Sequence, residues 1–176
     1  MADFHPGPLA QFSSLFDRVG KQWMLITAGN GKRANSMTAS WGAFGILWGK
    51  PVAICFIRPQ RHTFTLTEQA DRLSLTFFGE AYRSALTYMG RHSGKDGDKY
   101  AATGLNPVWS EGVPYLAEAD VAVICRKLYA GRLNKQDFID TSILPAHYPD
   151  DDYHQMYVCE IERVLVRDGA DEKKGS

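Results

Sequence analysis

The sequence has no long apolar run and no excess of charge of one sign. Its 176 residues contain 20 Lys and Arg against 20 Asp and Glu, so the formal net charge at pH 7 is zero. A neutral chain lacks the basic surface that nucleic acids require, so we expect no nucleic-acid partner. Because no segment reaches membrane-spanning length and the start MADFHPGPLA has no apolar signal core, we also expect no membrane contact and a cytoplasmic location.

Cysteine is scarce, with Cys55, Cys125 and Cys159 far apart along the chain. The number is odd, and no pair has the spacing of a zinc site. Cys55 and Cys125 fall inside apolar runs, which is typical of buried thiols. The sequence therefore predicts buried, reduced cysteines of a reducing compartment.

Motifs of metal and hydrolase chemistry are missing as well. The five histidines form no H-x-x-x-H pair, and there is no G-x-S-x-G elbow. The segment 96–107 starts like a calcium loop, but Tyr100 stands at a ligand position and Pro107 replaces the final glutamate. The run from Asp150 to Asp152 fits a solvated turn better than a catalytic carboxylate pair. We therefore predict no metal site and no catalytic acid or base.

What is present predicts a mainly β chain with a few short helices. Alternating or continuous apolar residues predict strands at 22–28, 36–42, 52–57, 72–79, 119–133 and 153–166. Turns are expected at 29–35 and 45–51, and helical segments at 63–70, 80–94 and 99–104. An antiparallel sheet with this many strands closes most readily into a barrel. We expect one domain over 1–168 and a solvated tail over 169–176.

The element ends carry their own signals. Thr63 or Thr65 is expected to cap the first helix, since Thr65 and Glu68 have capping-box spacing. Gly90 is expected to end the second helix. The strand 52–57 is apolar throughout, which predicts a central place in the sheet.

The stretch GNGKRA, from Gly29 to Ala34, is compatible with two structures. It fits the G-x-G-x-x-A form of a dinucleotide-binding turn, which needs a following helix to hold the pyrophosphate. The chain continues instead as NSMTASWG, and no acidic residue occurs between Asp17 and Glu68. A hairpin turn is therefore the favoured interpretation.

Three polar stretches remain, each at a strand end or in a loop. The strand NSMTASWG either presents amides and hydroxyls to a flat polar ligand or simply turns its polar side to water. In RPQRHT, Arg58 and Arg61 stand beside a helix start and suit a phosphate, although arginines also line sheet rims for solubility. The loop GRHSGKDGDK supplies lysines that either reach the same phosphate or are solvated. Together the three stretches indicate a phosphorylated, partly aromatic ligand.

These stretches carry a resemblance to a known family. The combination of N-x-M-T-A-S-W-G, R-P-x-R-x-T and S-G-K-D-x-D-K is similar to the flavin reductase-like family of FMN-binding split barrels, and within it to the flavoredoxin-like group. The resemblance runs from about Trp23 to Val166 and includes EADVAVICRKLY and DDYHQMYVCEI. It implies an antiparallel Greek-key β-barrel with a few short helices. One departure is Cys159, where the family pattern has glycine.

The resemblance also implies which residues bind the cofactor. The first strand would line the flavin and its ribityl chain, and the turn and the loop would meet the phosphate. The residues implicated are Asn35, Met37, Thr38, Ala39, Ser40, Trp41, Arg58, Arg61, His62, Thr63, Ser93, Gly94, Lys95 and Lys99. His154 and Tyr157 on the last strand are expected near the site. The family further implies a homodimer with each flavin near the subunit interface.

Function is narrowed by the resemblance but not fixed. One hypothesis is an NAD(P)H-dependent flavin reductase, in which nicotinamide passes a hydride to flavin N5 without help from an acid or base. The alternative is a flavoredoxin-like electron carrier that exchanges electrons with a protein partner. A third is an FMN-binding protein without redox activity. NADH or NADPH is the expected donor in the first case.

Overall fold

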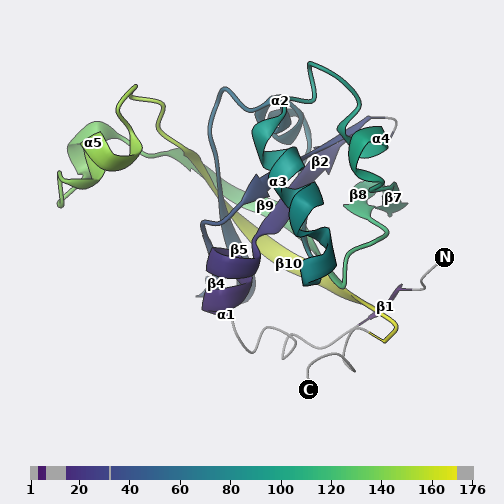
Figure 1. Ribbon diagram of the computed structural model, residues 1–176. Coiled ribbons are helices and arrows are strands. Elements are labelled where there is room, and N and C mark those ends of the chain that lie inside the picture. Colours follow the sequence, from purple (N-terminus) through teal and green to yellow (C-terminus); the bar gives the residue numbers. More distant parts are fainter. Residues whose placement is uncertain (1–3, 7–14, 32, 170–176) are drawn as a thin grey trace.

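The structure, a computed structural model, describes residues 4–6, 15–31 and 33–169. Eight strands form one antiparallel sheet in the order β3-β2-β6-β9-β10-β5-β4, with β1 pairing with the end of β10 (Figure 1). Their bounds are β1 Phe4–Pro6, β2 Met24–Gly29, β3 Ala34–Ala39, β4 Gly42–Leu47, β5 Lys50–Ile57, β6 Arg72–Phe77, β9 Val121–Arg132 and β10 Gln155–Arg167. A separate hairpin consists of β7 Pro107–Ser110 and β8 Val113–Leu116.

The two ends of this sheet are neighbours along the chain. β3 and β4 are the end strands of the sheet, yet only Ser40 and Trp41 connect them. A two-residue connection can bridge only a short gap, so the sheet must curl until its ends approach. The fold is thus an antiparallel split barrel, as predicted, and the split lies between β3 and β4.

Short helices cover the β2–β3 side of the barrel. α2 and α3 both pack against β2 and β3, and α4 lies beside α3 (Figure 1). The helical bounds are α1 Leu15–Asp17, α2 His62–Gln69, α3 Arg83–Arg91, α4 Lys99–Thr103 and α5 Ile143–His147. In Figure 1, α5 stands apart from these helices, at the far end of the segment between β9 and β10.

The barrel interior is filled by alternate residues of the long strands. Tyr157 and Cys159 of β10 face Cys55 of β5 and Cys125 of β9 in one cluster of buried side chains. All three cysteines are buried free thiols, which confirms the predicted burial. The hydrogen bond with Cys159, together with burial, raises the pKa of the Cys55 thiol well above the usual value, and burial raises the pKa of the Cys125 thiol in the same direction.

Most predicted strands are confirmed, but the second turn is shorter than predicted. The segment 45–51 contains the end of β4, a turn of Trp48 and Gly49 alone, and the start of β5. Trp48 and Gly49 have φ values of 53° and 69°, the geometry of the tightest hairpin turns. β4 also adds a strand beyond β5, so β5 is not central but lies next to the edge of the sheet.

The predicted helix ends also need correction. Arg61, and neither Thr63 nor Thr65, is the N-cap residue of α2, and it makes no side-chain cap. The Thr63 hydroxyl instead accepts a hydrogen bond from Asn35 of β3, so it bonds to a strand and does not cap the helix. α3 continues one residue past Gly90 and ends at Arg91.

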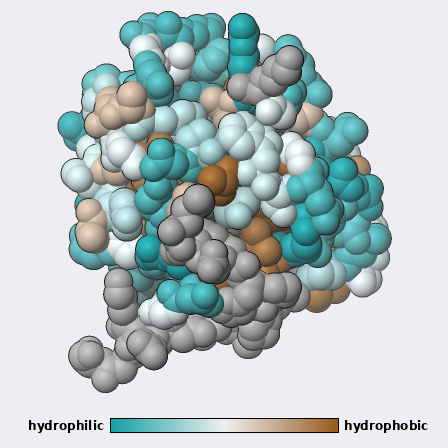
Figure 2. Space-filling model, turned by 90° about the vertical axis from the view of Figure 1, so that its right-hand side faces the viewer, coloured by the Kyte–Doolittle hydropathy of each residue, from teal (hydrophilic) through white to brown (hydrophobic). Residues whose placement is uncertain are grey.

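The outer surface is mostly polar. On the face in Figure 2, hydrophilic side chains predominate and hydrophobic atoms emerge as small separate patches. Among the described residues, no helix has the length and apolarity needed to span a membrane. Most of the predicted tail, residues 170–176, lies outside the described residues.

Candidate functional site

A cleft opens at the split of the barrel and consists of two joined cavities. One has a volume of about 160 Å³ and the other about 410 Å³. Met37, Arg58 and Arg61 line both, so the two cavities adjoin each other. We call the smaller one the ring cavity and the larger one the basic cavity.

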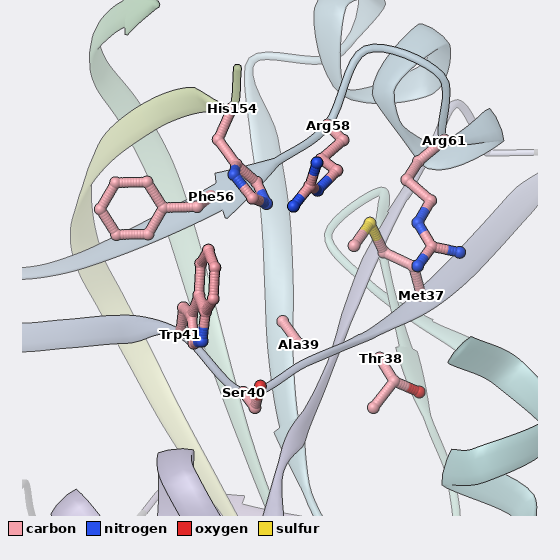
Figure 3. Close-up of a pocket in the computed structure, with 9 residues that line it drawn as sticks. All are labelled: Met37, Thr38, Ala39, Ser40, Trp41, Phe56, Arg58, Arg61 and His154. Carbon is pink, nitrogen blue, oxygen red and sulfur yellow. The ribbon is translucent and has the colours of Figure 1, made fainter. Parts of the chain in front are cut away.

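Aromatic side chains form one wall of the ring cavity (Figure 3). Trp41 leaves the connection between β3 and β4, and its ring centroid lies 5.2 Å from that of His154 and 5.2 Å from that of His147. Phe56 of β5 lies behind His154, with ring centroids 6.3 Å apart. Trp41 is 41% exposed, so this wall is open to solvent at its rim. Such a wall suits a flat ring.

The opposite wall of the ring cavity is the free edge of β3. Among the described strands β3 pairs only with β2, so half of its main-chain groups have no strand partner there. The main-chain oxygen of Ser36 accepts a hydrogen bond from Lys99, so the main-chain groups of Ser36 point to the free edge. Main-chain groups alternate along a strand, and therefore Thr38 also presents its N–H and C=O to this edge. A donor and an acceptor side by side can hold the edge of a polar heterocycle.

The basic cavity lies where the ends of α2, α3 and α4 converge. Lys99, at the start of α4, is only 5% exposed, and its ammonium group bonds to the carbonyls of Ser36 and Met89 at 2.6 and 3.1 Å. No carboxylate of the described residues pairs with it. Desolvation, with the nearby positive charge of Arg61, lowers the pKa of Lys99 to about 8. An anion in this cavity would relieve that unfavourable burial.

His62 adds an unmet hydrogen-bonding group to the basic cavity. Its buried Nδ1 has no partner among the described residues. Desolvation and the positive charges of Lys95 and Lys99 lower the pKa of His62, which favours its neutral imidazole. Arg61, at the N-terminus of α2, donates to the Gly90 carbonyl at 2.7 Å and has further donors to spare.

A buried hydrogen bond and a close glycine contact set the floor of the basic cavity. The Asn35 amide donates to the Thr63 hydroxyl at 2.7 Å, and both residues are buried. The loop after α3 approaches this pair through Gly94. A Cβ atom at Gly94 would lie 2.1 Å from Asn35 Oδ1 and 3.0 Å from His62 Cδ2, so a larger residue would force these side chains to move.

Arg58, which the sequence suggested as a phosphate ligand, lines the cleft but is already paired with other groups. Its guanidinium forms an ion pair with Asp152 and donates to the His147 carbonyl at 2.8 Å. Gln60 also donates to Asp152, at 2.6 Å. Asp152 therefore does not belong to a merely solvated turn, since it fastens the segment before β10 to the end of β5. Its second oxygen is buried without a partner among the described residues.

His154 reaches the ring cavity from the same segment. Its Nδ1 is hydrogen-bonded to the Tyr148 hydroxyl at 2.9 Å, and both residues are buried. Desolvation and the charge of Arg58 lower the pKa of His154 to about 4. Its imidazole is therefore neutral near pH 7, and in Figure 3 it points into the cavity toward Arg58.

The structure brings together nearly all of the residues implicated from the sequence. Those that line the two cavities are Asn35, Met37, Thr38, Ala39, Ser40, Trp41, Arg58, Arg61, His62, Thr63, Ser93, Gly94 and Lys99. Lys95 lines neither cavity. His154 lines the ring cavity, whereas Tyr157 is buried in the barrel core, where its hydroxyl bonds to Glu68. Tyr157 is therefore not placed at the site.

Sequence reasoning missed several lining residues. These are Phe56, Gln60, Met89, Arg91, His92, Asp96 and Asp152. Phe56 and Gln60 each lie two residues from Arg58 along the chain. Their closeness to a predicted ligand was therefore a signal that could have identified them. Asp152 comes from a distant loop, and no local pattern connects it with Arg58.

Comparisons with known proteins agree with this geometry. The family described as flavin reductase like domain matches residues 16–174. No curated protein sequence matches the chain.

Solved structures with the same fold bind flavins or carry flavin-linked names. An FMN-binding protein from Thermus thermophilus has a TM-score of 0.66 and 22% identity, covering 97% of this chain and 85% of its own. Flavoredoxin of Desulfovibrio vulgaris has a TM-score of 0.64 and 22% identity, covering 82% and 68%. An NADH:FAD oxidoreductase from Streptomyces globisporus, in complex with NAD and FAD fragments, has a TM-score of 0.62 and 15% identity, covering 90% and 84%.

Proposed function

Because this chain belongs to the flavin reductase like domain family, we propose that it binds FMN in the cleft and transfers electrons through it. The observation that carries this proposal is the pairing of a ring-sized aromatic cavity with a basic cavity in which Lys99 has no carboxylate partner among the described residues. A phosphorylated ring compound is the ligand class that both halves require.

The cleft residues fit the two ends of FMN. Lys99, Arg61 and the unpartnered Nδ1 of His62 would hold the phosphate, with the N-terminus of α2 beside them. Asn35, Thr63 and Gly94 would shape the passage for the ribityl chain. The free edge of β3 at Thr38 and the aromatic wall of Trp41 would hold the isoalloxazine ring.

The reaction we propose is NAD(P)H-dependent flavin reduction. When bound, FMN supplies the redox chemistry by accepting a hydride from the nicotinamide of NADH or NADPH. The protein's part is to orient the ring and leave one side open, which matches the partly exposed Trp41 at the rim. His154, which stays neutral near pH 7, adds no charge next to the ring. The likeness to an NADH:FAD oxidoreductase supports this function.

An electron carrier is the second candidate. The exposed edge of Trp41 would then face a protein partner rather than a nicotinamide, and electrons would pass through the rim of the cleft. The likeness to a flavoredoxin supports this alternative. Both candidates use the same cofactor and differ only in the electron donor.

We also propose a homodimer in which a second copy of the chain covers the segment between β9 and β10. This segment carries Ile139, which is 102% exposed, and Ile143. It stands apart from the barrel in Figure 1, yet Arg58 and Asp152 fasten its base to the rim of the cleft. A second copy packed there would lie next to the cofactor. The three free thiols fit a cytoplasmic location for such a protein.

The visible absorption spectrum of the purified, desalted protein tests the function. We expect a flavin spectrum, from retained or added FMN, that bleaches under anaerobic conditions with NADH or NADPH. Bleaching by dithionite but by neither nucleotide would replace the reductase with the carrier. A protein that takes up no FMN would overturn both.

A further inference from the structure

A third cavity adjoins the ring cavity at β3. Its volume is about 220 Å³, and Thr38 and Ser40 line both cavities. Its outer wall consists of Trp23, at the start of β2, and Leu86 and Thr87 of α3. This volume accommodates one flat ring rather than a whole dinucleotide. The cavity is not used by the FMN assignment above.

Trp23 is held at this cavity in a strained conformation. Its φ of 70° and ψ of 167° lie in a region that is essentially restricted to glycine. The Arg83 guanidinium stacks on the indole at 4.0 Å and donates to the carbonyls of Lys21 and Gln22. Strain of this kind persists only where surrounding contacts enforce it, and it is concentrated at ligand sites.

Arg91 supplies a charge that the rest of the site does not use. It lines both the third cavity and the basic cavity. Arg58 is paired with Asp152, Arg61 donates to Gly90, and Lys99 bonds to two carbonyls. Among the described residues, the Arg91 side chain makes no hydrogen bond or ion pair. It is thus a free guanidinium between the proposed phosphate site and an aromatic-walled cavity.

We propose that the third cavity and Arg91 form the subsite for the pyridine dinucleotide donor, with one flat ring against Trp23 and a phosphate on Arg91. This inference rests on the proposed reductase function and adds where the donor binds. A dinucleotide combines aromatic rings with phosphates, which is the chemistry that this pair of features recognises. The shared wall at Thr38 and Ser40 would bring the donor next to the flavin cavity.

The test measures the binding of NAD⁺ and NADP⁺, which do not reduce flavin, to the FMN-loaded protein by calorimetry. Replacing Arg91 with Gln should weaken the binding of at least one nucleotide about tenfold or more, because it removes a charge-assisted hydrogen bond. FMN binding by the same variant is measured alongside, because Arg91 also lines the basic cavity. The matched control is Arg33→Gln, which removes the same charge from an exposed residue that lines none of the three cavities.

A second variant tests the cavity without altering charge. Thr87→Leu adds bulk to the wall of the third cavity on a helix that tolerates leucine, and it should weaken nucleotide binding while FMN still binds. Unchanged nucleotide binding by both variants would overturn the subsite and leave the reductase function intact. A loss of FMN binding with Arg91→Gln would assign Arg91 to the FMN phosphate and overturn it as well. A wild-type protein that binds neither nucleotide would overturn the reductase function itself.

Discussion

The ammonium group of Lys99 lies 2.6 Å from the main-chain oxygen of Ser36. Through this bond and a second one to Met89, a buried lysine connects the free edge of β3 with the end of α3. Both partners are neutral carbonyls, so the positive charge has no compensating carboxylate among the described residues. The charge of Lys99 is therefore available to an anionic ligand, and its protonation should control how well that ligand binds.

FMN affinity should fall as the pH rises above about 8. The pKa of Lys99 is lowered to about 8 in the free protein, and a neighbouring phosphate would raise it again. Below that pH the lysine is charged in both states, so affinity is unaffected by its titration. Above it, binding must take up a proton, and affinity should fall by up to about tenfold per pH unit. Fluorescence titrations between pH 7 and 9.5 measure this. Riboflavin, which has no phosphate, should show a flatter profile, and an equal slope for both ligands would contradict the assignment.

Arg61 and Arg58 should affect ligand binding in different ways. Arg61→Ala should weaken FMN by about 1.5–3 kcal/mol more than riboflavin, because a charge-assisted bond to phosphate is lost. Arg58→Ala should mainly lower the melting temperature, because it leaves Asp152 without its ion-pair partner. Calorimetric binding of both ligands, combined with thermal unfolding, separates the two effects. If Arg61→Ala weakens both ligands equally, the phosphate lies elsewhere.

Even a methyl group at Gly94 should destabilise the protein. In Gly94→Ala the new Cβ would lie 2.1 Å from Asn35 Oδ1, so the Asn35–Thr63 hydrogen bond must move. We expect a loss of about 1–3 kcal/mol in stability and weaker FMN binding. Gly97→Ala is the matched control, since a Cβ there meets nothing within 4 Å. Chemical denaturation of both variants measures the difference in the free energy of unfolding. Equal stability would contradict the prediction, because it would show that the loop after α3 can shift without a cost in free energy.

Trp41 should report on the occupant of the ring cavity. A bound isoalloxazine next to its indole should quench its fluorescence, so Trp41→Phe should remove part of the quenching that FMN causes. Trp109 is similarly exposed, at 39% against 41% for Trp41, but lines neither cavity of the cleft, so Trp109→Phe is the control. The change in emission on titration with FMN measures both. Unchanged quenching in Trp41→Phe would place the ring away from this wall.

The sequence predicted the strands well because burial alternates or persists along them. β2, β6, β9 and β10 show that pattern directly, and the hairpin interpretation of Gly29 to Ala34 is confirmed by the antiparallel pairing of β2 with β3. β4 was missed because most of its side chains are exposed, so no apolar period marks it. Trp48 could not be foreseen at a positive φ, since tryptophan has no preference for that conformation.

The site was predicted in outline but not in its charges. Segments that resemble the family's motifs do converge, since the helix ends carry them to the same place. Which cations stay free depends on contacts between distant segments. Arg58 pairs with Asp152, and Lys99 bonds to the main chain of Ser36. The partners are far apart in the sequence, so no local pattern predicts either contact. For the same reason the sequence did not predict a role for Arg91, whose side chain has no partner among the described residues.

The split between β3 and β4 has a consequence for how the barrel moves. A ligand in the ring cavity would contact Met37 and Ala39 of β3 and Phe56 of β5, which lie toward opposite ends of the sheet order. The ligand would thus connect the two sides of the split, which no main-chain hydrogen bonds join among the described strands. Amide hydrogen exchange should then slow in both strands together when the cleft is filled, although many strands separate them in the sheet. The cofactor would therefore couple the motions of the two ends of the sheet.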